Sequence, residues 1–163
     1  MTTYKLRPYL PRDVPALAAI FQDAVEELAA DDYDADQRAA WATAVADEEA
    51  FAAHLATLLT LVVEADGVPA GFAALEDNAM IGLLYVHPRH ARKGVATTLC
   101  DALEKLAAAR GAKTITTDAS DTAQPFFAGR GYQPMRRNTV IRDGHWLGNT
   151  TMQKTLQPQG DAS

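Results

Sequence analysis

The residues that point most clearly to chemistry form a basic loop that leads into a glycine, within positions 84–97. This segment reads Leu-Tyr-Val-His-Pro-Arg-His-Ala-Arg-Lys-Gly-Val-Ala-Thr. The first turn of a helix leaves backbone N–H groups unpaired and carries a partial positive charge, which suits phosphate oxygens. Gly94 has no Cβ and lets an anion approach the backbone, and Arg92 and Lys93 add positive charge. The pattern therefore predicts an anion site; the alternative is an ordinary helix start with solvated basic residues.

Two familiar phosphate-binding patterns fit this loop poorly. A P-loop requires Gly-x-x-x-x-Gly-Lys-Ser/Thr, and a dinucleotide-binding fold requires Gly-x-Gly-x-x-Gly. Positions 92–96 contain one glycine and match neither pattern. The sequence thus favours another class of phosphate-containing ligand.

Composition limits the class of protein. The 163 residues fit one domain, and 48% hydrophobic with 22% charged residues is typical of a globular chain. A net charge of -6 argues against nucleic acid as a partner. The apolar runs are shorter than the roughly 20 residues that cross a bilayer, and the polar N-terminus lacks a targeting pattern, so we expect no membrane association and a cytoplasmic location. The single cysteine, Cys100, is expected in the core.

Changes in hydrophobic periodicity predict the elements that position the loop. We expect helices near 13–28, with Asp13 as its cap, and near 35–45, 47–58, 94–110 and 122–129, and strands at 4–7, 61–64, 68–75, 80–86, 113–119, 132–141 and 145–156. The hairpin turns force antiparallel pairs, whereas the helix at 94–110 permits a parallel crossover. The sequence thus predicts an α/β (α+β) domain over residues 1–156, followed by a flexible tail at 157–163.

Two segments together resemble the GCN5-related N-acetyltransferases, the GNAT family. The family follows a strand and a His-Pro pair with Gln/Arg-x-x-Gly-x-Gly/Ala, and positions 92–96 match all but the first place, which Ala91 occupies. Positions 119–132 resemble the family segment Ala-x-x-Phe-Tyr-x-x-x-Gly-Phe. The resemblance implies a mixed, mostly antiparallel twisted sheet of six or seven strands with helices on both faces. It also implies an acetyltransferase that uses acetyl-CoA as cosubstrate and favours a homodimer.

The resemblance places the cosubstrate between the strands at 80–86 and 113–119. Its pantetheine arm would hydrogen-bond to strand backbone as an added strand does. The implied binding residues are Leu84, Tyr85, Val86, Arg92, Lys93, Gly94, Val95, Ala96, Thr97, Ser120, Ala123, Phe126, Phe127 and Arg130. Core packing is the alternative for Phe126 and Phe127.

The residues expected to move protons are less clear. An amine with a pKa near 10.4 is about one part in a thousand neutral at about pH 7.4, so a base or a water chain should deprotonate it. The glutamate that many family members carry on the strand at 80–86 is absent, and Phe127 replaces the usual tyrosine acid. Asp118 is a candidate base or amine anchor, with a strand-end cap or salt-bridge partner as its alternative. Tyr85 and Tyr132 are candidate acids, with a packed aromatic as the alternative for each. His145 is a further candidate, although it follows a predicted turn, where an exposed side chain is expected. Catalysis by orientation and carbonyl polarisation alone is the alternative.

An acidic segment suggests a cationic acceptor. Seven acidic residues and no basic residue occur between Asp23 and Asp36. Family members form the acceptor cleft partly from this region, so Asp31 and Asp32 are candidate acceptor-binding residues, with Tyr33 and Trp41 as cleft aromatics. The alternatives are a solvated helix face with a polar loop, and plain packing of the two aromatics.

Three functions follow from these observations. The first is N-acetylation of a small-molecule or peptide amine. The second is a non-catalytic acyl-CoA-binding sensor or scaffold, because the expected glutamate and tyrosine are missing. The third is a phosphate-binding domain unrelated to CoA.

Overall fold

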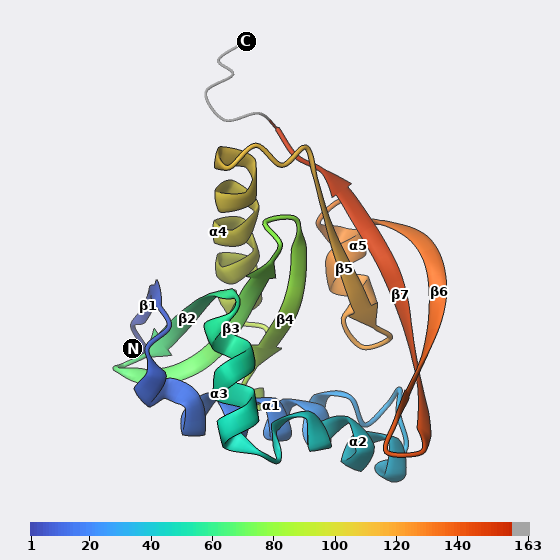
Figure 1. Cartoon of the computed structure of the whole chain (residues 1–163). Coiled ribbons are helices and arrows are strands. Elements are labelled where there is room, and N and C mark those ends of the chain that lie inside the picture. The colour runs from blue at the N-terminus through green and yellow to red at the C-terminus, as the bar shows by residue number, and fades with distance from the viewer. Residues whose placement is uncertain (158–163) are drawn as a thin grey trace.

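A seven-stranded sheet forms the centre of the computed structural model, which describes residues 1–157 (Figure 1). The strand order is β1-β2-β3-β4-β5-β7-β6, with β4 and β5 parallel and every other pair antiparallel. The strands are β1 (Tyr4–Pro8), β2 (Leu59–Ala65), β3 (Val68–Glu76), β4 (Met80–Val86), β5 (Thr114–Ser120), β6 (Gln133–Arg142) and β7 (His145–Thr155). The helices are α1 (Val14–Leu28), α2 (Ala35–Ala42), α3 (Glu48–Ala56), α4 (Val95–Ala109) and α5 (Gln124–Gly129), with short 3-10 turns at Pro11–Asp13, Thr43–Val45 and Pro88–His90. The predicted fold class is confirmed.

Two hydrophobic cores cover opposite faces of the sheet. On one face, Leu99 and Leu103 of α4 pack with strand residues such as Ile115. On the other face, Leu17 of α1 and Leu55 of α3 pack around Phe72. The two long helices, α1 and α4, are amphipathic, and their apolar stripes lie against the sheet as the helical spacing predicts. The cores hold β4 and β5 in place without joining them along their length.

The junction between β4 and β5 is short and opens into a gap. Only Met80 with Thr116 and Ile81 with Thr117 are paired across it, whereas β5 and β7 pair from end to end. The Thr117 hydroxyl donates to the Ile81 carbonyl at 3.0 Å, at the last paired level. Beyond that level the strands diverge, as Figure 1 shows. Peptide groups along the diverging edges are therefore available to a ligand.

A bulge in β4 lies at the start of this gap. Across the β3–β4 pair, Ala74 faces Leu83 and Leu75 faces Ile81, so Gly82 is the extra residue. A bulge bends the strand and changes where the neighbouring side chains point. The bulge therefore contributes to the divergence of β4 from β5.

Several local expectations can be compared with the structure. Gly111 follows α4 at φ 95°, and the N–H of Ala112 bonds to the Ala107 carbonyl at 2.9 Å, a typical glycine C-terminal cap. Cys100 is buried in the core, as expected.

Asp13 occupies the expected N-cap position of α1, but its side chain makes no capping hydrogen bond to that helix. The Asp13 carboxylate instead accepts hydrogen bonds from the Arg7 guanidinium at 2.7 and 2.8 Å and from the Leu10 N–H at 2.8 Å. A guanidinium can bind both carboxylate oxygens and so competes with the cap position. Apart from Gln157, the predicted tail lies outside the described residues. No helix within residues 1–157 is long and apolar enough to cross a membrane.

Candidate active site

A cleft of about 1080 Å³ occupies the gap between β4 and β5. Its walls come from both strands, from α1 and the segment after it, and from the start of α4. Residues from α3, such as Phe51 and His54, and from the β6–β7 hairpin, such as Arg142, also line it. The cleft therefore joins the basic loop to the level where β4 and β5 separate.

The basic loop presents an open helix N-terminus to this cleft. Gly94 precedes α4 at φ 84°, and no side chain caps the helix. Arg92 is also left-handed, at φ 62°, so the chain turns sharply before the helix. A Cβ placed on Gly94 would meet no atom within 4 Å. The first-turn residues Val95, Ala96 and Thr97 line the cleft, and no side chain caps their N–H groups. This geometry suits an anion, as the sequence predicts.

Two histidines fix the loop to its neighbours. His87 Nε2 lies 3.0 Å from Asp23 Oδ2 on α1, and His87 Nδ1 accepts from the Arg89 N–H at 3.1 Å. His90 Nδ1 lies 3.0 Å from the Tyr4 hydroxyl on β1. Burial, together with the nearby positive charges, lowers the pKa of His90. His90 therefore faces the cleft as a neutral ring at neutral pH.

Most of the expected cosubstrate residues lie together on the cleft wall. They are Leu84, Tyr85, Val86, Arg92, Gly94, Val95, Ala96, Thr97, Ser120, Ala123, Phe126 and Phe127. Lys93 and Arg130 do not line the cleft. Arg130 forms ion pairs with Asp101 at 2.8 Å and Glu104 at 2.9 Å, and its guanidinium lies 5.8 Å from the ring centroid of Phe126, which does line the cleft.

Tyr132 is also not brought to the cleft. Its side chain is buried, and its hydroxyl donates to Glu104 Oε2 at 2.8 Å. Burial and the adjacent negative charge raise its pKa. Tyr132 does not line the cleft, and its proton is already donated to Glu104, so the geometry does not favour it as the acid. His145 likewise does not line the cleft.

Tyr85 does face the cleft, in an aromatic environment. Its ring centroid lies 4.1 Å from that of Phe21 and 5.7 Å from that of Phe72, and its hydroxyl accepts from Trp41 Nε1 at 3.2 Å. Burial raises the pKa of Tyr85 to about 12. The hydroxyl therefore stays protonated at neutral pH and has its own proton to donate.

Asp118 lies on β5, on the cleft wall just beyond the last paired level. The Thr151 hydroxyl donates to its Oδ1 at 2.6 Å. The side chain is exposed, so one carboxylate oxygen is engaged while the other is open to a ligand. This arrangement suits an anchor for a positively charged group.

The expected acceptor residues divide into two kinds. Tyr33 and Trp41 line the cleft, with ring centroids 5.2 Å apart. The Tyr33 hydroxyl donates to the Gly148 carbonyl at 2.6 Å and accepts from the Asp121 N–H at 2.9 Å. It therefore ties the segment after α1 to β7 and to the loop after β5.

The acidic segment does not form the cleft wall. None of its seven acidic residues lines the cleft, so the structure does not bring Asp31 and Asp32 to the cleft wall. Asp32 accepts from the Thr122 hydroxyl at 2.8 Å, and Asp34 caps α2 through the Gln37 N–H at 2.8 Å. Short acidic side chains satisfy nearby donors at caps and loops before they reach a distant site.

Sequence reasoning missed two features of the cleft wall. Glu76, the last residue of β3, lines the cleft, and Gly82 beside it marks the bulge. Glu76 begins the Glu-Asp-Asn segment that predicts a turn, so its position at the end of a strand is not evident. A lone glycine within an apolar strand is the available signal, because it often marks a bulge or a close approach.

Comparison with known proteins identifies the family. A model of the acetyltransferase (GNAT) domain matches residues 29–156, so the chain belongs to the GNAT family and the protein is an acetyltransferase. The uncharacterized N-acetyltransferase YafP of Escherichia coli (strain K12) is 34% identical over 152 residues, 93% of this chain and 96% of that protein.

Solved structures agree with this assignment. A GCN5-related N-acetyltransferase from Rhodopseudomonas palustris has a TM-score of 0.92 and 55% identity, covering 94% of this chain and 96% of that one. YncA from Salmonella typhimurium, solved with its cofactor acetyl-CoA, has a TM-score of 0.64 and 26% identity, covering 98% of this chain and 99% of that one.

Proposed function

We propose that the protein transfers the acetyl group of acetyl-CoA to an amine of a small molecule or peptide, by direct attack within a ternary complex. The observation that carries this proposal is the divergence of β4 from β5 after two residue pairs, with the open start of α4 at one end of the resulting cleft. A long ligand with a pyrophosphate group and an amide-containing arm fits such a cleft. The acetyl-CoA complex of YncA supports the choice of cosubstrate.

The loop would hold the phosphates through backbone and side chain together. The first-turn N–H groups of α4 are accessible, and Arg92 adds a guanidinium at the cleft wall. Ala91 has no polar group, so one side-chain contact of the family pattern is missing while the backbone donors remain. Leu84, Tyr85 and Val86 would bind the arm along the diverging edge of β4. Bound there, acetyl-CoA supplies the activated acetyl carbonyl.

The end of the cleft opposite the start of α4 would bind a positively charged acceptor. Asp118 offers a carboxylate oxygen there, and Tyr85 offers a protonated hydroxyl for the departing thiolate. Tyr33 and Trp41 would form the aromatic side of the acceptor site. A cationic amine is the acceptor class that these groups favour.

The test is thiol release from acetyl-CoA over a panel of polyamines, aminoglycosides, amino acids and peptides. Acetyl-CoA should raise the melting temperature, whereas inorganic phosphate and NAD should not. At least one amine should release CoA thiol and gain the mass of one acetyl group. Stabilisation by acetyl-CoA with no turnover on any amine would contradict the proposal and favour a non-catalytic sensor.

A further inference from the structure

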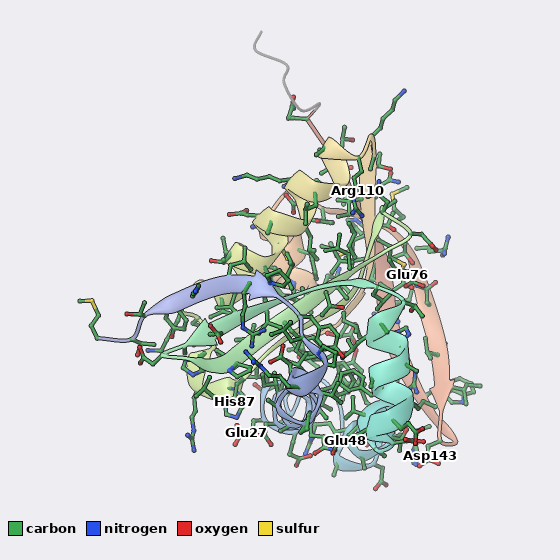
Figure 2. All side chains as sticks on the ribbon, turned by 60° about the vertical axis from the view of Figure 1, so that its left-hand side comes forward. Glu27, Glu48, Glu76, His87, Arg110 and Asp143 are labelled. Carbon is green, nitrogen blue, oxygen red and sulfur yellow. The ribbon has the colours of Figure 1, made fainter. Side chains whose placement is uncertain are left out.

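Glu76 is the one cleft-lining carboxylate, besides Asp118, found in the described part of the chain. It ends β3, where its register partner is Met80 at the start of β4. Figure 2 shows the labelled Glu76 and His87 at opposite ends of the β3–β4 hairpin. Glu76 therefore lies far from the basic loop, toward the level where β4 and β5 separate.

The bulge gives the Glu76 side chain its space. A Cβ built on Gly82 would lie 3.0 Å from Glu76 Oε2 and 3.7 Å from Glu76 Cβ. The carboxylate thus lies over the backbone of Gly82, at a place that any larger residue would crowd. Gly82 also directly follows Ile81, the last β4 residue paired with β5.

Glu76 and Asp118 share one face of the sheet. Their neighbours Leu75 and Ala119 both pack in the α4 core, and side chains alternate along a strand, so Glu76 and Asp118 point to the opposite face. Two strand spacings separate β3 from β5, roughly 10 Å. Through Met80, Glu76 is level with Thr116, so Asp118 lies two residues farther along β5 and the two carboxylates face each other diagonally across β4. An amine over β4 between them would therefore have a carboxylate on either side.

The two carboxylates differ in what already binds them. Asp118 accepts a hydrogen bond from Thr151 at 2.6 Å, whereas no side chain within residues 1–157 forms a hydrogen bond or an ion pair with Glu76. A base needs a free lone pair directed at the proton that it removes. The Glu76 carboxylate has its lone pairs free of such partners, whereas Asp118, with one oxygen already engaged, is better suited to anchor the acceptor.

We propose that Glu76, held over Gly82 at the β4 bulge, is the general base that deprotonates the acceptor amine. This inference rests on the proposed N-acetyltransferase function. The base is thus assigned to β3, because β4 itself contains no carboxylate.

The proposed reaction conserves protons and bonds. Glu76 takes one proton from the acceptor ammonium and later returns it to water. The neutral nitrogen then bonds to the acetyl carbonyl carbon while the carbon–sulfur bond breaks. The second proton lost by nitrogen replaces the one that Tyr85 gives to the thiolate, so the products are the acetylated amine and CoA thiol.

The test compares Glu76→Gln with Asp77→Asn, using acetyl-CoA and the best amine of the panel above. Asp77 is the next residue, lies outside the cleft and has a left-handed φ of 49° that asparagine tolerates, so it is a matched control for the loss of charge. Glu76→Gln should lower kcat by about 100-fold or more, because general base catalysis contributes about 10²–10⁴-fold. Asp77→Asn should leave kcat unchanged, and both variants should bind acetyl-CoA like the wild type.

The pH profile separates a base from a merely structural residue. Without a base, the rate follows the neutral fraction of the amine, which rises about tenfold per pH unit below an amine pKa near 10.4. The deficit of Glu76→Gln should therefore shrink as the pH rises. A deficit that stays constant with pH would contradict the assignment of Glu76 as the base.

Gly82→Ala provides a second variant that keeps the carboxylate. The added methyl group should displace the end of the flexible Glu76 side chain and lower kcat by about tenfold, less than complete loss of the base. In the Glu76→Gln background the same change should have little further effect, since interacting residues are not additive. Full additivity would mean that Gly82 does not act through Glu76.

Failure of this inference differs from failure of the proposed function. If the wild type acetylates an amine and Glu76→Gln matches Asp77→Asn, the base is assigned wrongly while the function stands. If the wild type binds acetyl-CoA and acetylates no amine, the proposed function fails and the inference fails with it.

Discussion

The two ends of the cleft are constructed differently. At the end where we propose that the phosphates bind, one continuous stretch from His87 to Thr97 supplies the turn, the positive charge and the helix start. At the end where we propose acetyl transfer, the corresponding groups come from β3, β4, β5 and the segment after α1, and include Glu76, Asp118 and Tyr33. Under the proposed function, cosubstrate binding would therefore depend on local conformation, whereas acceptor chemistry would depend on how distant strands meet.

This difference also determines how far the sequence alone can predict the site. Gly94 and Arg92 act within a few residues of each other, so their spacing is visible in the chain. The proposed role of Glu76 requires the β3–β4 register and the bulge at Gly82, which follow from packing of the whole sheet. The elements themselves were predictable because their apolar residues keep helical or alternating spacing.

Three residues that the sequence predicts at the site do not line the cleft, and this too follows from contacts that only the folded chain creates. Asp31, Asp32 and Arg130 have the right charge for their expected roles, but each lies outside the cleft. Asp32 and Arg130 instead bind partners that the folded chain brings closer. Charge along a sequence indicates what a residue can bind and leaves open which partner it meets first.

The first prediction concerns a variant that changes only the end of the cleft where the phosphates would bind. Gly94→Ala should weaken acetyl-CoA binding by about tenfold, or about 1.4 kcal/mol, because alanine resists the φ of 84° and adds a methyl group where the phosphates would lie. Isothermal titration with acetyl-CoA measures this change.

Gly67→Ala is the matched control for backbone strain. Gly67 has φ 87°, and a Cβ there also meets nothing within 4 Å, but it lies in the β2–β3 turn away from the cleft. Both variants should lose a similar amount of stability, and only Gly94→Ala should lose affinity. Equal loss of affinity in both would show that backbone strain, rather than the phosphate seat, explains the effect.

The second prediction compares the two neighbouring basic residues of the loop before α4. Arg92→Ala should raise the Kd for acetyl-CoA by about fivefold and reduce its salt dependence, because Arg92 lines the cleft. Lys93→Ala should have a smaller effect on Kd, since Lys93 does not line it. Titrations at low and high salt measure both, and the reverse order would contradict this description of the loop.

The third prediction concerns the acceptor end. Tyr33→Phe removes the hydroxyl that joins Gly148 and Asp121, so the wall beside Trp41 should loosen and stability should fall by about 1–3 kcal/mol. The acceptor KM should rise by about threefold, consistent with a loss near 0.6 kcal/mol. The acetyl-CoA Kd should not change. A change in the acetyl-CoA Kd with no change in the acceptor KM would contradict the assignment of Tyr33 to the acceptor site.

The fourth prediction is an effect on stability with none on activity. Tyr132→Phe removes one donor from the Glu104 carboxylate and should lower the free energy of unfolding by about 1 kcal/mol. Because Tyr132 does not line the cleft, kcat should be unchanged. A fall in kcat in the folded variant would return Tyr132 to the list of acids.

The hydrogen bond between Tyr132 and Glu104 should also make the free energy of unfolding depend on pH. Burial works to raise the pKa of Glu104, but hydrogen bonds from Lys154, Arg130 and Tyr132 lower it below its usual 4.5. A lowered pKa stabilises the fold above the usual value, and that contribution is lost as the pH falls through the lowered one. The stability gap between wild type and Tyr132→Phe should therefore close in acid. A gap that widens there would contradict this origin of the lowered pKa.

The central claim is that one cleft binds cosubstrate at one end and transfers the acetyl group at the other. The most direct test measures acetyl-CoA Kd and kcat for Gly94→Ala and Glu76→Gln together. Gly94→Ala should raise Kd by about tenfold with little change in kcat at saturation, whereas Glu76→Gln should lower kcat by about 100-fold with Kd unchanged. If both variants change the same constant, the two ends do not have separate roles.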